Sequence, residues 1–218
     1  MKCRSVAYVL TAVVCGAGLA ACGSDDGGGK DDKTVAGAEE KTTHPAPSPS
    51  ASASDSAVKR PEIKLPKDIS MTFEGGKTGD AAKDKALADS AERMRALNAV
   101  IAGTDPGGKA LAVYTTGTAT EASASWINQF KDAGLTITGQ FRYYDRKATL
   151  NDDGTASVVF CADESKAYAK EEKTGKVRRT TPSDEDFIIY NTRLAKNDDG
   201  IWQTTQVISK AGVKQCVR

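Results

Sequence analysis

The segment LTITGQFRYYDRKATL (residues 135–150) marks the point where the chain changes from helical to strand periodicity. Apolar and polar residues alternate along it, and aromatic and β-branched residues are frequent, which is typical of a β-strand with one buried face. Gly139 inside the segment indicates a bulge or a bend, which a strongly curved sheet would use. Three later segments show the same strand pattern: TASVVFCADES (155–165), DFIIYNTRLAK (186–196) and IWQTTQVIS (201–209).

The chain before this point predicts an extended arm and then a helix. Residues 63–76 (IKLPKDISMTFEGG) alternate in the manner of a strand. Asp80 is a suitable N-cap for the helix, and Gly103 is a suitable residue to close it. The helix would bury one apolar stripe, consisting of Leu87, Ala91, Met94, Leu97 and Ile101.

Two further helices are expected before the strands begin. The first is a short one over residues 109–114. The second is TATEASASWINQFKDAG (residues 118–134), in which Thr118 and Glu121 have the spacing of a capping box and Gly134 supplies the stop. Helices first and antiparallel strands afterwards predict an α+β domain, with N-terminal helices packed on a curved antiparallel sheet.

The connections at residues 151–154 and 197–200 both read Asn-Asp-Asp-Gly. Carboxylates followed by a glycine suggest a calcium loop as one interpretation. An EF-hand loop, however, spreads its ligands over about twelve residues and ends in a glutamate, and neither connection has this pattern. Asn and Asp with a final glycine are also what short hairpin turns require, so we predict turns.

Residues 1–21 have the pattern of an export signal. Lys2 and Arg4 precede an apolar stretch that is too short to span a bilayer comfortably. The tetrapeptide Leu-Ala-Ala-Cys that ends at Cys22 resembles the bacterial lipobox, which implies cleavage before Cys22 and a diacylglyceryl thioether on its sulfur. Two acyl chains retain a protein stably, so we expect a lipid anchor at the extracytoplasmic face of the cell membrane. The alternative is an ordinary secretory peptide that leaves Cys22 as a stray thiol.

Residues 22–61 predict a disordered spacer, and residues 62–218 predict one folded domain. Gly, Ser, Ala, Pro, Asp and Lys dominate the spacer, which therefore has too little apolar surface to offset the entropy of ordering. His44, the only histidine of the chain, lies in this spacer, and its simplest interpretation is a solvated linker residue.

Two cysteines, Cys161 and Cys216, remain after the export signal and the acylated Cys22 are set aside. An exported domain meets an oxidising environment, so we predict a disulfide that ties the C-terminal end to a strand. The alternative, a redox-active dithiol, would favour a Cys-x-x-Cys spacing.

Acidic and basic residues nearly balance, with a formal net charge of +1, so nothing in the composition favours a nucleic-acid partner. A local basic stretch lies in residues 173–179. We interpret it as a solvated edge of a hairpin turning at Thr174-Gly175, with contact to an anionic wall polymer as the alternative. Its cations are Lys173, Lys176, Arg178 and Arg179.

From about Leu65 to Cys216 the chain resembles actinobacterial exported lipoproteins with an NTF2-like (SnoaL-like) cone domain. The segments that carry the resemblance are SWINQFKDAG, GQFRYYD, KTGKV, YNTRL and WQTTQVIS. In NTF2-like enzymes, His and Asp at the mouth of the cone perform acid–base chemistry, whereas this domain contains no histidine. By architecture the chain also resembles CseA-type lipoproteins, which are encoded with an envelope-stress sensor kinase.

Three functions follow as hypotheses. The first is a non-catalytic module at the cell envelope that binds another protein or a wall component and modulates envelope-stress signalling. The second is a binder of a small apolar ligand in the cone. The third is an enzyme with Asp145 or Asp163 as its base. The sequence favours the first because both aspartates have the setting of solvated residues, and with it we expect no catalytic residue, no metal and no cofactor. The candidate ligand-binding residues are Trp126, Phe130, Tyr143 and Phe160.

Overall fold

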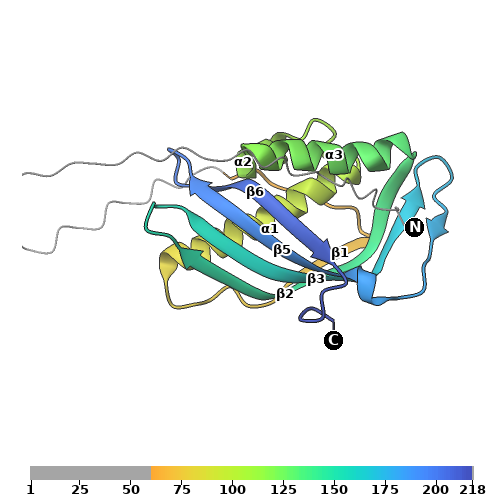
Figure 1. The fold of residues 1–218 in the computed structure, drawn as a ribbon. Helices are drawn as coiled ribbons and strands as arrows, with labels where there is room; N and C mark the ends of the chain where they lie inside the picture. Colours follow the sequence, from red (N-terminus) through yellow and green to blue (C-terminus); the bar gives the residue numbers. More distant parts are fainter. Residues whose placement is uncertain (1–59, 218) are drawn as a thin grey trace, which may run out of the picture. The chain divides into compact units, whose positions relative to one another are not determined.

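The computed structural model describes residues 60–217, and within this part a curved sheet carries three α-helices on one face (Figure 1). The strand order is β1-β2-β3-β5-β6, and the short β4 pairs with β3. The export signal, Cys22 and nearly all of the spacer lie outside the described residues. The elements are β1 (Ile69–Phe73), α1 (Ala81–Ile101), α2 (Lys109–Tyr114), α3 (Thr118–Asp132), β2 (Leu135–Leu150), β3 (Ala156–Glu171), β4 (Val177–Arg178), a 3-10 turn (Asp184–Asp186), β5 (Phe187–Lys196) and β6 (Trp202–Ala211).

The α+β class is confirmed, but the sheet is mixed rather than purely antiparallel. β1 runs parallel to β2, with Ile69 opposite Gly139 and Phe73 opposite Tyr143. All other pairs of these strands are antiparallel. All three helices lie between β1 and β2 in the sequence, and a crossover of this length allows two strands to pair in parallel.

Helix α1 contacts β2, β3 and β6 as well as α2 and α3, and both α2 and α3 also contact β6 directly. As predicted, Asp80 caps it, because its carboxylate accepts hydrogen bonds from the backbone N–H groups of Ala82 and Lys83. The whole predicted apolar stripe is buried. The helix also buries four polar residues that the stripe did not include, namely Asp89, Ser90, Arg93 and Asn98.

Helix α3 begins differently from the prediction. Gly117 is the N-cap, and no side chain caps the helix, so the predicted capping box of Thr118 and Glu121 is wrong. The Thr118 hydroxyl instead donates to the carbonyl of Thr205 on β6. A Cβ atom at Gly117 would lie 2.9 Å from that same carbonyl oxygen, so the close approach of helix and strand requires glycine. The predicted stop at Gly134, with φ 62°, is confirmed.

The sheet bends at Gly139, as its position in the strand predicted. The pairing of β2 with β3 shifts register between Gln140 and Arg142, where two residue steps on β2 oppose three on β3. Gly139 has φ 103°, and a Cβ atom there would overlap with the carbonyl oxygen of Lys166. The bulge therefore combines a glycine-only backbone conformation with a contact that excludes any side chain.

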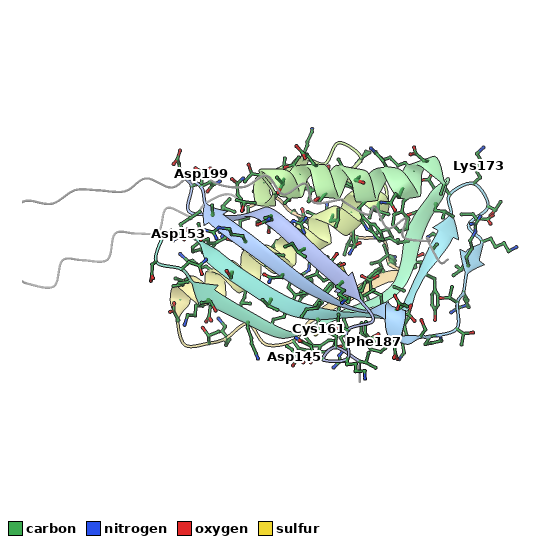
Figure 2. The ribbon with its side chains drawn as sticks, in the orientation of Figure 1. Asp145, Asp153, Cys161, Lys173, Phe187 and Asp199 are labelled. Atoms are coloured by element: carbon green, nitrogen blue, oxygen red, sulfur yellow. A yellow bond between two sulfur atoms is a disulfide. The ribbon has the colours of Figure 1, made fainter. Side chains whose placement is uncertain are left out.

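Both Asn-Asp-Asp-Gly connections are hairpin turns at one end of the sheet (Figure 2). In each, the backbone N–H of the glycine donates to the carbonyl of the asparagine, and both glycines have φ 77°. The predicted disulfide between Cys161 and Cys216 is present and fixes the C-terminal end against the outer face of β3. It packs with Tyr144, Phe187 and Ile189 in a small cluster apart from the main core.

Arg60, which the sequence assigned to the spacer, is held against α1. Its guanidinium makes three hydrogen bonds of 2.8–3.1 Å to Asp89, which is 1% exposed and also accepts from the backbone N–H of Trp202. Asp89 thus joins the start of the domain to its last strand. Among the described residues, no helix is long and apolar enough to cross a membrane.

Candidate functional site

The inner, helix-facing side of the sheet places one carboxylate among aromatic residues. On β3, Phe160 and Ala162 point inward and are buried in the main core. Glu164 is the next residue in this alternation, and it lies at the bulge opposite the bend in β2. Its side chain is only partly buried. Glu164 is therefore a partly accessible acid on the same, helix-facing side of β3 as the core residues Phe160 and Ala162.

Two tyrosines on the neighbouring strands, Tyr143 and Tyr190, interact electrostatically with Glu164. Tyr190 on β5 stacks on Phe160 with ring centroids 4.9 Å apart, and Tyr143 on β2 meets Phe160 edge-on at 5.9 Å. Burial raises the pKa of both phenols, and the Glu164 carboxylate raises them further. Both hydroxyls therefore stay protonated at neutral pH and are available as hydrogen-bond donors. Tyr143 is buried, whereas Tyr190 is partly accessible.

Glu164 has the properties of a proton acceptor that works near neutral pH. Burial raises its pKa from 4.5 to about 7, and the nearby carboxylates of Asp186 and Asp163 contribute in the same direction. Among residues 60–217 no hydrogen bond or ion pair to Glu164 opposes this increase. A carboxylate with a pKa near the working pH is half ionised, which suits both the acceptance and the return of a proton.

Arg93 supplies a positive charge behind the two tyrosines. It extends from α1, is 4% exposed, and donates to the Ser123 hydroxyl at 2.8 Å. Its Nε atom is buried without a partner, and no carboxylate within residues 60–217 pairs with it. Burial lowers the pKa of Arg93 to about 10, so the guanidinium remains charged at neutral pH. The charge interacts with Tyr143 and Tyr190, and it therefore favours negative charge near their hydroxyl groups.

The four aromatic residues predicted to bind a ligand form two separate pairs. Trp126 and Phe130 contact each other edge-on at 5.3 Å on α3, and Trp126 is 44% exposed. Tyr143 and Phe160 belong to the inner face, and the narrow gap that they share with Met94 holds no space for a water molecule. Only the second pair adjoins Glu164, so the structure brings two of the four to the candidate site.

The two aspartates considered as catalytic bases lie elsewhere. Asp145 is exposed and occupies the left-handed region, with φ 49°, at a second irregularity in the pairing of β2. Asp163 accepts hydrogen bonds from the backbone and hydroxyl of Ser165 and lies 3.8 Å from Arg142. Glu164, immediately beside Asp163, is the acid that burial perturbs. The signal for it was present in the sequence, because Glu164 continues the inward alternation of Phe160 and Ala162.

No protein-family model matches the sequence, and no curated protein matches it. The fold is similar to that of several solved structures. Aln2 from a Streptomyces species is 16% identical, with a TM-score of 0.39 over 57% of this chain and 88% of that one. ActVI-ORFA from Streptomyces coelicolor is 11% identical, with a TM-score of 0.39 over 58% and 92%. A proposed ketosteroid isomerase from Shewanella frigidimarina is 18% identical, with a TM-score of 0.33 over 60% and 98%.

The sequence-based expectation that this domain is not an enzyme is corrected. A structure described as a proposed ketosteroid isomerase is among those with a similar fold. The expectation rested on Asp145 and Asp163 as the candidate bases. It did not consider Glu164, whose pKa burial raises to about 7.

Proposed function

We propose that the domain binds a small, largely apolar molecule on the inner face of its sheet and that Glu164 transfers a proton to and from it. The observation that carries the proposal is the partly accessible Glu164 carboxylate. Its pKa is raised to about 7, it interacts electrostatically with Tyr190, and it has no counter-ion within residues 60–217. Such a perturbed group in an aromatic setting is a physical marker of acid–base function.

The neighbouring groups support a ligand that carries a carbonyl oxygen. The Glu164 carboxylate would remove a proton from the carbon next to the carbonyl, and the electron pair of the C–H bond would move onto the oxygen as an enolate. The Tyr190 hydroxyl would donate a hydrogen bond to that oxygen, and the positive charge of Arg93 would stabilise its negative charge. Return of the proton from Glu164 to another carbon would complete an isomerisation.

The aromatic walls support an apolar ligand framework. Tyr190 and Ile188 pack against the main core but keep part of their surface accessible. Surface of this kind binds flat apolar molecules, while a few polar groups fix their orientation. We therefore propose a compact ketone or a related carbonyl compound as the substrate class. We also propose that the domain works at the extracytoplasmic face of the membrane, through a lipid on Cys22; the lipobox-like sequence supports this anchor.

The test is exchange of solvent deuterium into 2-tetralone, an apolar ketone with acidic C–H groups, followed by proton NMR. We expect the full-length chain to accelerate exchange above the buffer rate. We expect Glu164→Gln to lower that acceleration by at least ~100-fold, because a positioned general base contributes about 10²–10⁴. Glu172→Gln is the matched control, since Glu172 is an exposed glutamate on the β3–β4 hairpin.

The pH profile provides a second readout. The base must be ionised, so the exchange rate should rise with pH through an apparent pKa of about 7 and level off above it. Glu164→Gln should remove this inflection, whereas Tyr190→Phe should lower the rate and leave the inflection in place. Exchange at the buffer rate in the unmodified chain, or an unchanged rate in Glu164→Gln, would contradict the proposed function.

A further inference from the structure

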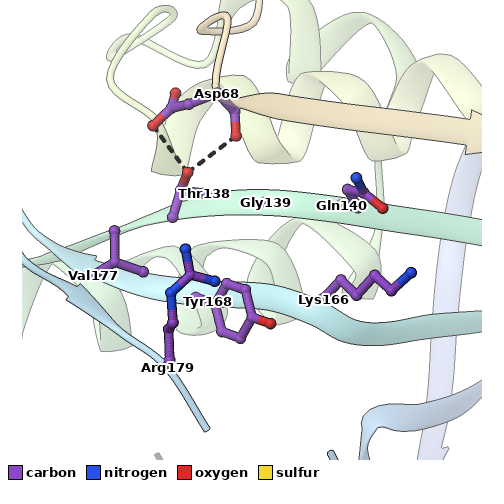
Figure 3. A pocket seen from close by; sticks show the side chains of 8 residues that line it. All are labelled: Asp68, Thr138, Gly139, Gln140, Lys166, Tyr168, Val177 and Arg179. Carbon is purple, nitrogen blue, oxygen red and sulfur yellow. Dashed lines mark hydrogen bonds between the residues drawn. The ribbon is translucent and has the colours of Figure 1, made fainter.

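A groove of about 450 Å³ lies on the outer face of the sheet, the face opposite to the helices (Figure 3). It lies over the paired strands β2 and β3 next to the bulge, beside β4, which pairs with β3. Thr138 and Gln140 line it from β2, and Lys166 and Tyr168 line it from β3. The remaining lining residues are Asp68, Gly139, Val177 and Arg179.

The charge of the groove is positive. Lys166 and Arg179 are exposed, and neither has an ion-pair partner within residues 60–217. Asp68 is the only acid in the lining, and its charge is already balanced, because its carboxylate binds the ammonium of Lys170 at 2.6 Å. That lysine and the Thr138 hydroxyl lower the pKa of Asp68, so the pair stays ionised. Two cationic side chains are therefore left to attract an anion.

One of the two cationic side chains, Arg179, has a defined contact within the groove. The Arg179 guanidinium lies 4.9 Å above the ring of Tyr168, a cation–π contact that keeps it over the floor rather than free in solvent. Figure 3 shows Arg179 beside Tyr168 and Lys166 further along the same strand. The Thr138 hydroxyl donates to Asp68, at 2.9 Å to its carboxylate and at 3.0 Å to its backbone carbonyl. The polar groups that face the opening are thus mainly donors: an ammonium, a guanidinium, the amide of Gln140 and a phenol.

We propose that this groove binds a phosphate group of a larger ligand, with Lys166 and Arg179 as its two cationic contacts. A phosphate offers several acceptor oxygens and up to two negative charges, which match two cations and further neutral donors from different strands. Guanidinium groups bind phosphate oxygens in pairs, and lysine acts as a compact point charge beside them. The aromatic floor and Val177 leave room for an uncharged polyol next to the phosphate. The site is independent of the inner-face chemistry.

The test measures binding to the full-length chain by isothermal titration calorimetry at pH 7.5 and moderate salt. The probes are inorganic phosphate, glycerol 3-phosphate and linear polyphosphate. We expect the double variant Lys166→Gln/Arg179→Gln to weaken glycerol 3-phosphate binding at least tenfold. The control is Lys173→Gln/Lys210→Gln, which removes the same two charges from exposed positions outside the lining, and we expect it to change affinity less than twofold.

The three probes distinguish the sources of the phosphate. Tighter binding of glycerol 3-phosphate than of inorganic phosphate indicates that the ligand is a small phosphate ester. Saturable binding of polyphosphate that the double variant abolishes indicates a phosphate-bearing polymer. Either result supports the site. The proposal is overturned if the control variant weakens binding as much as the double variant does, or if no probe binds. It is also overturned if citrate binds as tightly as the phosphate esters, because the groove would then not select for phosphate.

Discussion

Replacement of Glu164 by glutamine should make the domain more stable, and the gain should depend on pH. The pKa of Glu164 is about 7 in the folded chain and near its ordinary value of 4.5 when the chain is unfolded. Ionisation is therefore harder in the folded state. Below pH 4.5 Glu164 is protonated in both states and does not affect the free energy of unfolding. As the pH rises from 4.5 through 7, the free energy of unfolding decreases.

The magnitude follows from the difference between the two pKa values. A difference of about 2.5 units, at about 1.4 kcal/mol for each unit, sets an upper limit of about 3.4 kcal/mol for the destabilisation above pH 7. The side chain keeps part of its surface in water, so the measured value should be smaller, at about 1–3 kcal/mol. Glutamine cannot ionise and has nearly the same shape, so Glu164→Gln should recover this free energy at pH 8 and differ little from the unmodified chain at pH 4.5.

Urea unfolding at a series of pH values from 4.5 to 8.5, without reductant, measures the effect. The difference in free energy of unfolding between Glu164→Gln and the unmodified chain should grow by up to ~1.4 kcal/mol per pH unit across the interval and then level off. Glu172→Gln, at an exposed position, should show no such trend. A difference that is constant with pH, or that grows toward low pH, would refute the assignment of Glu164 as a buried acid without a counter-ion.

Three further predictions address other parts of the chain. Gly139→Ala should lower the free energy of unfolding by about 3 kcal/mol, because the new side chain is strained at φ 103° and also overlaps with the facing carbonyl. Gly154→Ala, at φ 77° with open space around it, should lower it by about 1 kcal/mol, and urea unfolding measures both values. Replacing Cys161 and Cys216 together by serine should lower the free energy of unfolding by about 4 kcal/mol, the value of the chain-entropy model for a separation of 55 residues. If both thiols of the unmodified chain can be alkylated without reductant, the disulfide is not present. Cys22→Ser should abolish palmitate labelling and release the chain from membrane pellets, and continued labelling would exclude the lipid anchor.

Local patterns in the sequence are sufficient for most of the sheet. The alternation of apolar and polar residues places every long strand, and Gly139 marks the bend because only glycine tolerates its backbone angle and its close neighbour. Cys161 and Cys216 can be paired because no other cysteine lies in residues 62–218. The parallel pairing of β1 does not follow from the sequence, since a short extended segment carries no sign of the direction of its partner.

Most of the candidate site escapes sequence reasoning, for a physical reason. Charged residues are normally solvated, so neither Arg93 nor Glu164 stands out among the many charged residues of the chain. Each nevertheless continues an inward-facing pattern: Arg93 lies three residues after Ser90 and four before Leu97 on the buried side of α1, and Glu164 follows Ala162 on β3. Periodicity alone can identify both as charged residues on buried faces. It cannot indicate that their side chains converge on the same tyrosines, because that depends on the packing of α1 across the sheet.

Arg93 and Glu164 lie on the same side of the sheet and are not paired, and this separation is itself informative. An ion pair between them would lower the pKa of the carboxylate, whereas the pKa of Glu164 is raised. A core arranged for stability alone would pair the two charges or replace them, because an unpaired buried ion costs several kcal/mol. Here Tyr190 interacts electrostatically with both. A ligand oxygen that becomes negative beside Tyr190 would be attracted by Arg93 and would raise the pKa of Glu164 further, so the acid would hold the proton it has taken until the ligand accepts it back.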